Sequence, residues 1–118
     1  MKQQPIPTPI SPVDLNRWLQ QPEGIPICVD VREEQELQVA SFSSSVVHLP
    51  LSESSNWMNN IAEIVPSGTS IVVICHLGLR SFNFGSWLLQ QELGHQVWNL
   101  EGGIDAWSVA VDQSIPRY

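Results

Sequence analysis

The sequence predicts an α/β sandwich built on a parallel sheet, and three observations support this prediction. The length of 118 residues fits one domain, and a hydrophobic share of 42% is ordinary for a globular protein. Segments of strand character alternate with segments of helical character four times along the chain. The run at residues 70–75 is β-branched without alternation, which is typical of a central strand buried on both faces.

The N-terminal segment is rich in proline, which restricts φ and favours extended backbone. We expect residues 1–9 to be extended and residues 10–118 to form a single domain. Ser11 followed by Pro12 fits the N-cap and first position of a helix, which Pro22 ends.

The other elements follow from apolar runs and from the turn residues between them. Strands are expected at residues 25–31, 46–49, 70–75 and 95–100. Helices are expected at 33–40, from Ser54 or Ser55 through Ile64, at 81–93 and at 104–111. Gly94 is expected directly after the third of these helices, and Gly102 with Gly103 opens the last one.

The charge of the chain restricts its partners. Five Lys and Arg residues oppose twelve Asp and Glu residues, which gives a net charge of −7. This balance excludes the basic face of a nucleic-acid-binding module and disfavours an anionic membrane surface. No apolar run approaches the ~20 residues of a transmembrane helix, and the N-terminus shows no signal peptide. We therefore expect a cytoplasmic protein without nucleic-acid or membrane partners.

The two cysteines, Cys28 and Cys75, are too few for a disulfide framework. Cys28 lies within a predicted buried strand, so we expect it in the core. His48 and His95 lie at strand positions, where structural roles are expected. Together these four residues show no metal-ligand spacing, and no metal is expected.

Cys75 lies at the carboxyl end of the predicted central strand, where ligands bind in open parallel sheets. The loop from His76 to Arg80 leads into a helix, and the helix N-terminus and Arg80 both favour an anion there. Gly78 permits a tight curl. A cysteine so placed should be largely thiolate at neutral pH. An inert, buried Cys75 is the alternative, which the combination of strand, glycine, arginine and helix disfavours.

The spacing between Cys75 and Arg80 separates two kinds of chemistry. Four residues lie between them, one fewer than in the cradle of a cysteine phosphatase, and Ser81 stands where that arginine would be. The smaller cradle suits a terminal sulfur atom better than a phosphoryl group. A phosphatase or an arsenate reductase is therefore disfavoured.

Several motifs in order resemble the rhodanese-like sulfurtransferase family. The segment CHLGLRS (75–81) resembles the family's active loop, and DVRE (30–33) with Glu36 resembles its strand end followed by an acidic helix. HLPL (48–51) resembles the family's short strand with a proline, and LEGGIDAW (100–107) resembles its Gly-Gly segment. The tail, residues 111–118, resembles the end of some single-domain and adenylyltransferase-fused members. One segment departs from the family pattern, because residues 40–46 lack its histidine and glycines. Since this segment borders the active-site side in the family, the departure concerns substrate identity.

The resemblance implies a rhodanese-like sandwich, whose central, mostly parallel five-stranded sheet is flanked by helices on both faces. It also implies a thiosulfate sulfurtransferase-like enzyme without a cofactor. Such an enzyme moves a sulfane sulfur from thiosulfate or a protein persulfide to a thiol acceptor through a Cys75 persulfide. The alternative is a sulfur-relay or protein-binding module of the same fold that does not turn over.

The resemblance assigns Cys75 as the catalytic residue. The loop that would bind the persulfide consists of His76, Leu77, Gly78, Leu79, Arg80 and Ser81. Asp30 and Arg32 are expected to hold neighbouring loops by charge-assisted hydrogen bonds, and Gly102 with Gly103 to form a tight turn near the site. His76 either tunes Cys75 or is a solvated loop residue. Because Arg80 is the loop's one firm cation and the chain is acidic, we expect weak thiosulfate affinity.

Overall fold

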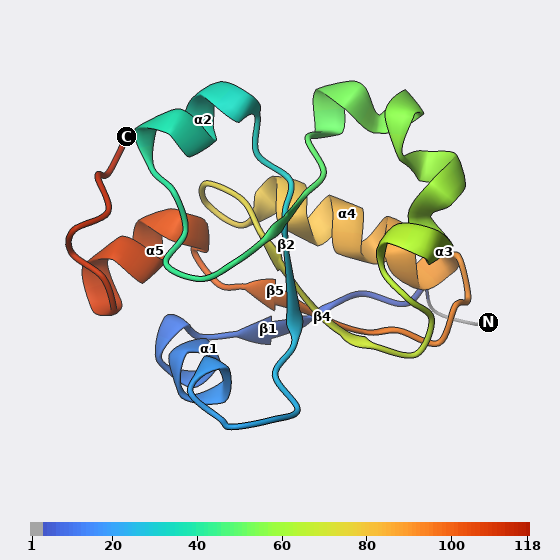
Figure 1. The fold of residues 1–118 in the computed structure, drawn as a ribbon, viewed down its shortest axis with the longest axis horizontal. Helices are drawn as coiled ribbons and strands as arrows, with labels where there is room; N and C mark the ends of the chain where they lie inside the picture. The colour runs from blue at the N-terminus through green and yellow to red at the C-terminus, as the bar shows by residue number, and fades with distance from the viewer. Residues whose placement is uncertain (1–3) are drawn as a thin grey trace.

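A five-stranded sheet forms the centre of the protein in a computed structural model, which describes residues 4–118 (Figure 1). The strands lie in the order β1-β5-β4-β2-β3, and every neighbouring pair is parallel. They are Thr8–Ile10 (β1), Ile27–Asp30 (β2), Val47–His48 (β3), Ser70–Ile74 (β4) and Gln96–Leu100 (β5). β4 is the middle strand, as its β-branched run predicts.

Helices cover both faces of the sheet, and each face has its own core. Pro12–Leu19 (α1) and Gly103–Ala110 (α5) pack on one face, where Leu15 and Trp107 meet Val72. Ile61–Ile64 (α3) and Leu79–Gln90 (α4) pack on the other face, where Phe84 meets Val73. Glu34–Val39 (α2) follows the end of β2, and the C-terminus lies beside it (Figure 1). The predicted α/β class with a parallel sheet is confirmed.

Capping residues explain where the first two helices begin. The Ser11 hydroxyl accepts a hydrogen bond from the Asp14 backbone N–H at 3.1 Å, with Pro12 in the first helical position as predicted. At the start of α2, the Glu33 backbone N–H donates to Glu36 Oε2 at 2.8 Å. This bond places the Glu36 side chain at the carboxyl edge of the sheet.

The predicted helix through Ile64 is wrong in its extent. The chain instead forms two 3₁₀ helices, Leu51–Asn56 (η1) and Met58–Asn60 (η2), followed by the short α3. The backbone leaves helical geometry at Glu53 (φ −111°, ψ 26°) and at Trp57 (φ −127°, ψ −17°). Serine and asparagine dominate this segment and compete with helical backbone bonds. The Trp57 indole N–H also donates to the Pro50 carbonyl at 3.0 Å, which holds the irregular turn.

Both ends of α4 differ from the prediction. The helix begins at Leu79 rather than at Ser81, so Arg80 lies in its first turn instead of in a loop. Gly78 is the N-cap with φ 110°, a conformation that favours glycine. After the helix, Glu92 (φ 57°) rather than Gly94 is the first residue in the left-handed region.

The other elements lie close to their predicted positions, and one strand was not predicted. Residues 8–10 form β1, and Thr8, Pro9 and Ile10 pair with Trp98, Asn99 and Leu100 of β5. The division of the chain at residue 10 stays a prediction. Across residues 4–118, every helix falls short of the length and hydropathy that crossing a membrane requires.

Candidate active site

The sulfur of Cys75 lies directly after β4, at the carboxyl edge of the sheet. The residue is buried, with 1% of its surface exposed. Its Sγ accepts a hydrogen bond from the Gly78 backbone N–H at 3.0 Å and lies 3.1 Å from Ser81 Oγ. A backbone donor and a buried hydroxyl therefore hold the sulfur where the chain turns from β4 into α4.

A small pocket opens over this sulfur. Cys75, His76, Leu77, Leu79 and Arg80 line it, and its volume is about 170 Å³. The Leu77 and Leu79 side chains are 62% and 72% exposed, so the rim is apolar. Of the predicted loop residues, His76, Leu77, Leu79 and Arg80 thus line one hollow. Gly78 and Ser81 do not line it and contact the Cys75 sulfur instead, and residues 79–81 belong to α4.

Ser81 and Asn99 connect this loop to the neighbouring strand β5. Ser81 is fully buried, and its hydroxyl donates to Asn99 Oδ1 at 2.5 Å. Asn99 Nδ2 donates in turn to the Gly78 carbonyl at 3.0 Å. The sequence analysis does not identify Asn99, because its place beside the loop depends on β5 lying next to β4 in the sheet.

Arg80 lines the pocket and also forms an ion pair with a carboxylate. Its Nη1 and Nη2 lie 2.7 and 2.8 Å from the two carboxylate oxygens of Glu36 on α2. Hydrogen bonds from Arg80 lower the pKa of Glu36 to about 2, and the same carboxylate raises the pKa of Arg80. Arg80 therefore ties α4 to α2, and the positive charge expected at the loop is compensated.

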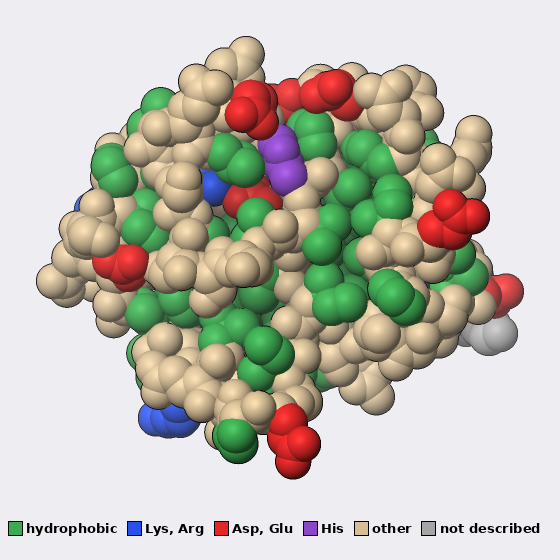
Figure 2. Space-filling model, viewed as in Figure 1, with side chains coloured by type: hydrophobic (Ala, Val, Ile, Leu, Met, Phe, Trp, Pro, Cys, Tyr) green, Lys and Arg blue, Asp and Glu red, His purple; other side chains and the backbone are tan. Residues whose placement is uncertain are grey.

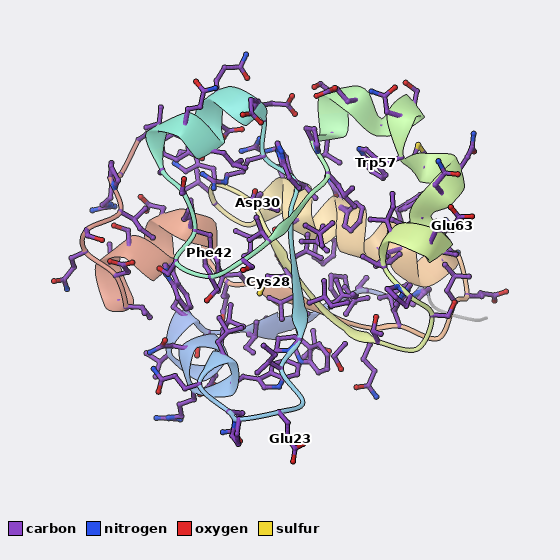
Figure 3. All side chains as sticks on the ribbon, viewed as in Figure 1. Glu23, Cys28, Asp30, Phe42, Trp57 and Glu63 are labelled. Atoms are coloured by element: carbon purple, nitrogen blue, oxygen red, sulfur yellow. The ribbon has the colours of Figure 1, made fainter. Side chains whose placement is uncertain are left out.

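Asp30, which Figure 3 labels at the end of β2, forms the second pair at this edge with Arg32. Both side chains are completely buried, with Arg32 Nη2 2.8 Å and Nε 3.0 Å from the Asp30 carboxylate. The backbone N–H of Arg32 also donates to Asp30 Oδ1 at 3.0 Å. Their charge-assisted bonds agree with the expected structural pairing.

Tyr118 joins the two pairs from the far end of the chain. Its hydroxyl donates to Glu36 Oε1 at 2.9 Å and accepts from Arg32 Nη1 at 3.1 Å. Its ring stacks on His76, with the centroids 3.9 Å apart and the planes 8° from parallel. Burial raises the pKa of Tyr118. Local sequence patterns give no signal for this residue, because its hydrogen-bond partners lie 82 and 86 positions earlier in the chain.

Gly102 and Gly103, the N-cap and the first residue of α5, lie against the Cys75 loop. Gly103 has φ 63°, and a Cβ there would overlap the His76 carbonyl and lie 2.5 Å from the Cys75 carbonyl. This close approach lets Ile104 N donate to the Cys75 carbonyl at 2.8 Å and Asp105 N to the His76 carbonyl at 3.2 Å. The first turn of α5 therefore fixes the backbone that carries Cys75.

The other cysteine belongs to the opposite side of the sheet. Cys28 packs in the core beneath α1 and α5, while Cys75 packs with the core beneath α4. Burial, and then the neighbouring Asp30 carboxylate, raise the pKa of the Cys28 thiol to about 12. Cys28 is a core residue, as expected.

The segment at residues 40–46 packs against α5. Phe42 lies 4.6 Å from Trp107 between ring centroids, and both Figure 3 and the core contacts place it beside that helix. The Trp107 indole N–H donates to Ser43 Oγ at 2.9 Å. The lining of the Cys75 pocket comes instead from residues 75–80.

The two structural histidines both bond backbone carbonyls. His48 Nε2 lies 2.6 Å from the Arg32 carbonyl, and His95 Nε2 lies 3.0 Å from the carbonyls of Val65 and Pro66. These contacts agree with the structural roles expected for them.

Known proteins resemble this chain over most of its length. The model of the rhodanese-like domain family matches residues 11–110. The chain is 37% identical over 90 residues to the Rhodanese-like/PpiC domain-containing protein 12, chloroplastic, of Arabidopsis thaliana, a match that covers 76% of this chain and 29% of that protein. It is 32% identical over 92 residues to the adenylyltransferase and sulfurtransferase UBA4 of Yarrowia lipolytica, covering 78% and 22%. The chain thus spans less than a third of either relative.

A solved structure of similar size also resembles this chain over most of its length. The rhodanese-related protein of Thermoplasma volcanium superposes with a TM-score of 0.65 and is 27% identical. The match covers 92% of this chain and 95% of that one.

Proposed function

The chain belongs to the rhodanese-like domain family, and from that premise we propose that it is a sulfurtransferase whose Cys75 carries the transferred sulfur as a persulfide. One observation supports this assignment above the others. Cys75 lines the pocket at the end of the central strand, with the Gly78 N–H donating to its sulfur and α4 beginning beside it. A donor and a helix N-terminus at one sulfur stabilise negative charge there.

In the first step, the Cys75 thiolate attacks the outer sulfur of the donor. A bond forms between Cys75 Sγ and that sulfur, and the sulfur–sulfur bond of the donor breaks. The donor's electron pair leaves on its own sulfur, as a thiolate from a persulfide or as sulfite from thiosulfate. The Gly78 N–H and the N-terminus of α4 would hold the enzyme persulfide in the pocket.

In the second step, the thiolate of an acceptor attacks the outer sulfur of the Cys75 persulfide. The new bond makes the acceptor a persulfide, and the broken bond returns Cys75 as a thiolate. In both steps the attacking thiolate supplies the electron pair of the new bond, and the pair of the broken bond stays with the leaving group, so the cycle as written is balanced without a redox cofactor.

The surroundings of the pocket favour a protein persulfide over thiosulfate as the donor. Glu36 compensates the charge of Arg80, and the chain as a whole carries −7. Both features oppose a small dianion. The exposed Leu77 and Leu79 give a rim that can bury apolar surface of a protein partner. Both cysteines are free thiols, which agrees with a reducing compartment such as the cytoplasm.

The proposal is tested by loading the purified protein with a persulfide donor or with thiosulfate. Intact mass spectrometry should show a gain of one sulfur atom, which a small thiol then removes. Cys75→Ser should gain none, while the matched variant Cys28→Ser should behave as the wild type. A Cys75→Ser protein that still takes up and passes on sulfur would refute the assignment.

A sulfur-relay module is the second candidate, and the apolar rim of Leu77 and Leu79 favours it. Such a module would take up sulfur on Cys75 and release it to a partner protein alone. The same experiment distinguishes the two, because a relay module retains its sulfur in the presence of small thiols.

A further inference from the structure

The buried hydroxyl of Ser81 lies between two groups that compete for its one proton. Ser81 Oγ is 3.1 Å from Cys75 Sγ and 2.5 Å from Asn99 Oδ1. A hydroxyl donates a single hydrogen bond, and an amide oxygen only accepts. The proton therefore points to Asn99 whenever Asn99 presents its oxygen to Ser81.

The Gly78 carbonyl determines which way the Asn99 amide faces. Asn99 Nδ2 lies 3.0 Å from that carbonyl, which can only accept. The reverse orientation would place the amide oxygen against the carbonyl oxygen, two acceptors without a proton between them. The backbone N–H of Gly78 donates to Cys75 Sγ and completes a ring of Cys75, Ser81, Asn99 and Gly78.

In this ring, Ser81 presents a lone pair to the Cys75 sulfur. That arrangement suits a thiol, whose S–H can donate to Ser81. A thiolate has no proton to give, so Ser81 must turn its hydroxyl away from Asn99 to donate to the charged sulfur. We propose that Asn99 is a positioning residue that holds the Ser81 proton away from Cys75 and so limits how readily this sulfur takes on negative charge. The inference rests on the proposed role of Cys75 as the sulfur carrier.

The charged and titratable groups around the sulfur are separate from this ring. They come from the loop, α4, α2, α5, the end of β2 and the C-terminal segment: His76, Arg80, Glu36, Asp105, Asp30, Arg32 and Tyr118. Asn99→Leu alters none of them and keeps the branched shape of the side chain. A change in the behaviour of Cys75 in this variant therefore reports on the hydrogen bonds of the ring.

The test is the rate of alkylation of Cys75 by iodoacetamide as a function of pH, followed by intact mass. In Asn99→Leu the Ser81 proton is free to donate to the thiolate. We expect the midpoint of the rate profile to move to lower pH by about one unit, the size of one charge-assisted hydrogen bond. Cys75→Ser measures the background from Cys28, which is buried.

The same comparison in a Ser81→Ala protein separates this role from a structural one. In Ser81→Ala, the further change Asn99→Leu should leave the profile where it is, because no hydroxyl remains to redirect. Loss of the Asn99 bond to Gly78 could also disturb the loop, but that effect would persist without Ser81. An equal shift in both backgrounds, or no shift in either, would overturn the inference.

The folding of each variant and the proposed function are checked separately from the alkylation rate. Circular dichroism checks each variant, and Asn99→Ala takes the place of Asn99→Leu if the larger side chain prevents folding. Alkylation requires no sulfur donor. Absence of sulfur uptake by the wild type would therefore count against the proposed function, while an unchanged alkylation profile would count against the role of Asn99 alone.

Discussion

The ends of β2 and β4 lie side by side in the sheet, and each is followed by an arginine, but the two ends differ in how their charges are satisfied. At the end of β2, Asp30 and Arg32 bond each other and both are fully buried. At the end of β4, Arg80 reaches across to Glu36 on α2, and its side chain remains 35% exposed. The first pair is formed within one strand end and is sealed from solvent, whereas the second pair joins two helices and lies at a pocket.

This difference separates a structural pair from the site that we propose to be reactive. A buried arginine whose donors are directed to a neighbouring carboxylate has little left to offer a substrate. The end of β4 keeps a cysteine at the pocket, with a backbone donor beside its sulfur. A buried pair of aspartate and arginine at a strand end is therefore a weak indication of catalysis, whereas a cysteine that lines a pocket is a stronger one. Substitutions at each end test this distinction.

Asp30→Ala should have the largest effect on stability. It leaves the Arg32 guanidinium buried without its carboxylate, and we expect the free energy of unfolding to fall by about 3–5 kcal/mol. Urea unfolding followed by tryptophan fluorescence measures this. The matched change is Asp14→Ala, whose partner Arg17 is exposed and which should cost about 1 kcal/mol or less. Equal losses in the two variants would contradict the distinction between closed and exposed pairs.

Gly103→Ala should rank next, because its Cβ would overlap the backbone that carries Cys75. Strain at positive φ and the overlap together predict a loss of about 2–4 kcal/mol, measured by the same unfolding experiment. Gly68→Ala is the control, since Gly68 has a similar φ and open space around it. If Gly68→Ala costs as much, the close approach of α5 to the loop is not what matters.

Glu36→Gln tests the open end of β4. At neutral pH it should lower the free energy of unfolding by about 1–2 kcal/mol, reduced by the exposure of Arg80. The pKa of Glu36 is about 2 in the folded protein against 4.5 ordinarily, so its stabilisation is complete above pH 4.5. It is lost as the pH falls toward 2. The wild type and the variant should therefore converge over that window, and a constant difference would argue against the ion pair.

The same variant addresses the choice of donor. Without the Glu36 carboxylate, Arg80 keeps an uncompensated charge at the pocket, and the KM for thiosulfate should fall by roughly fivefold, the effect of about 1 kcal/mol of attraction. Glu34→Gln removes an equal charge from α2 without touching Arg80. A KM that changes equally in both variants would indicate an effect of net charge alone.

Tyr118→Phe should have the smallest effect. It removes the hydroxyl that joins Arg32 to Glu36 but keeps a ring to stack on His76. We expect a loss of about 1 kcal/mol, seen as a small decrease in the melting temperature. A melting temperature equal to that of the wild type would show that the hydroxyl does not stabilise the two strand ends.

Sequence patterns predicted the parts of the site that are close along the chain. Cys75, Gly78 and Ser81 belong to one strand-turn-helix unit, whose signals are local. Glu36 appears in the sequence analysis as part of a motif, but its bond to Arg80 does not. That bond, like the contacts of Asn99 and Tyr118, depends on which elements the sheet brings together.

The same reasoning explains the errors in the fold. Trp57, Ile61 and Ile64 have helical spacing, but the serines and asparagines between and before them allow 3₁₀ turns instead. The strand β1 has only three residues and is a strand because it pairs with β5, which its own sequence does not indicate. Apolar runs long enough to be buried on their own, such as β4, were predicted close to their true bounds.

The strand order also determines when the site is completed during synthesis. Translation delivers β4 and α4, with Cys75 and Ser81, before it delivers Asn99, Gly103 and Tyr118. β1 is made first, yet it must wait for β5, because Thr8 pairs with Trp98. At roughly 5–20 residues per second, several seconds therefore separate the synthesis of β1 from that of its partner strand β5. The contacts that enclose the Cys75 loop therefore need residues made after it, although Cys75 directly follows the strand at the centre of the sheet.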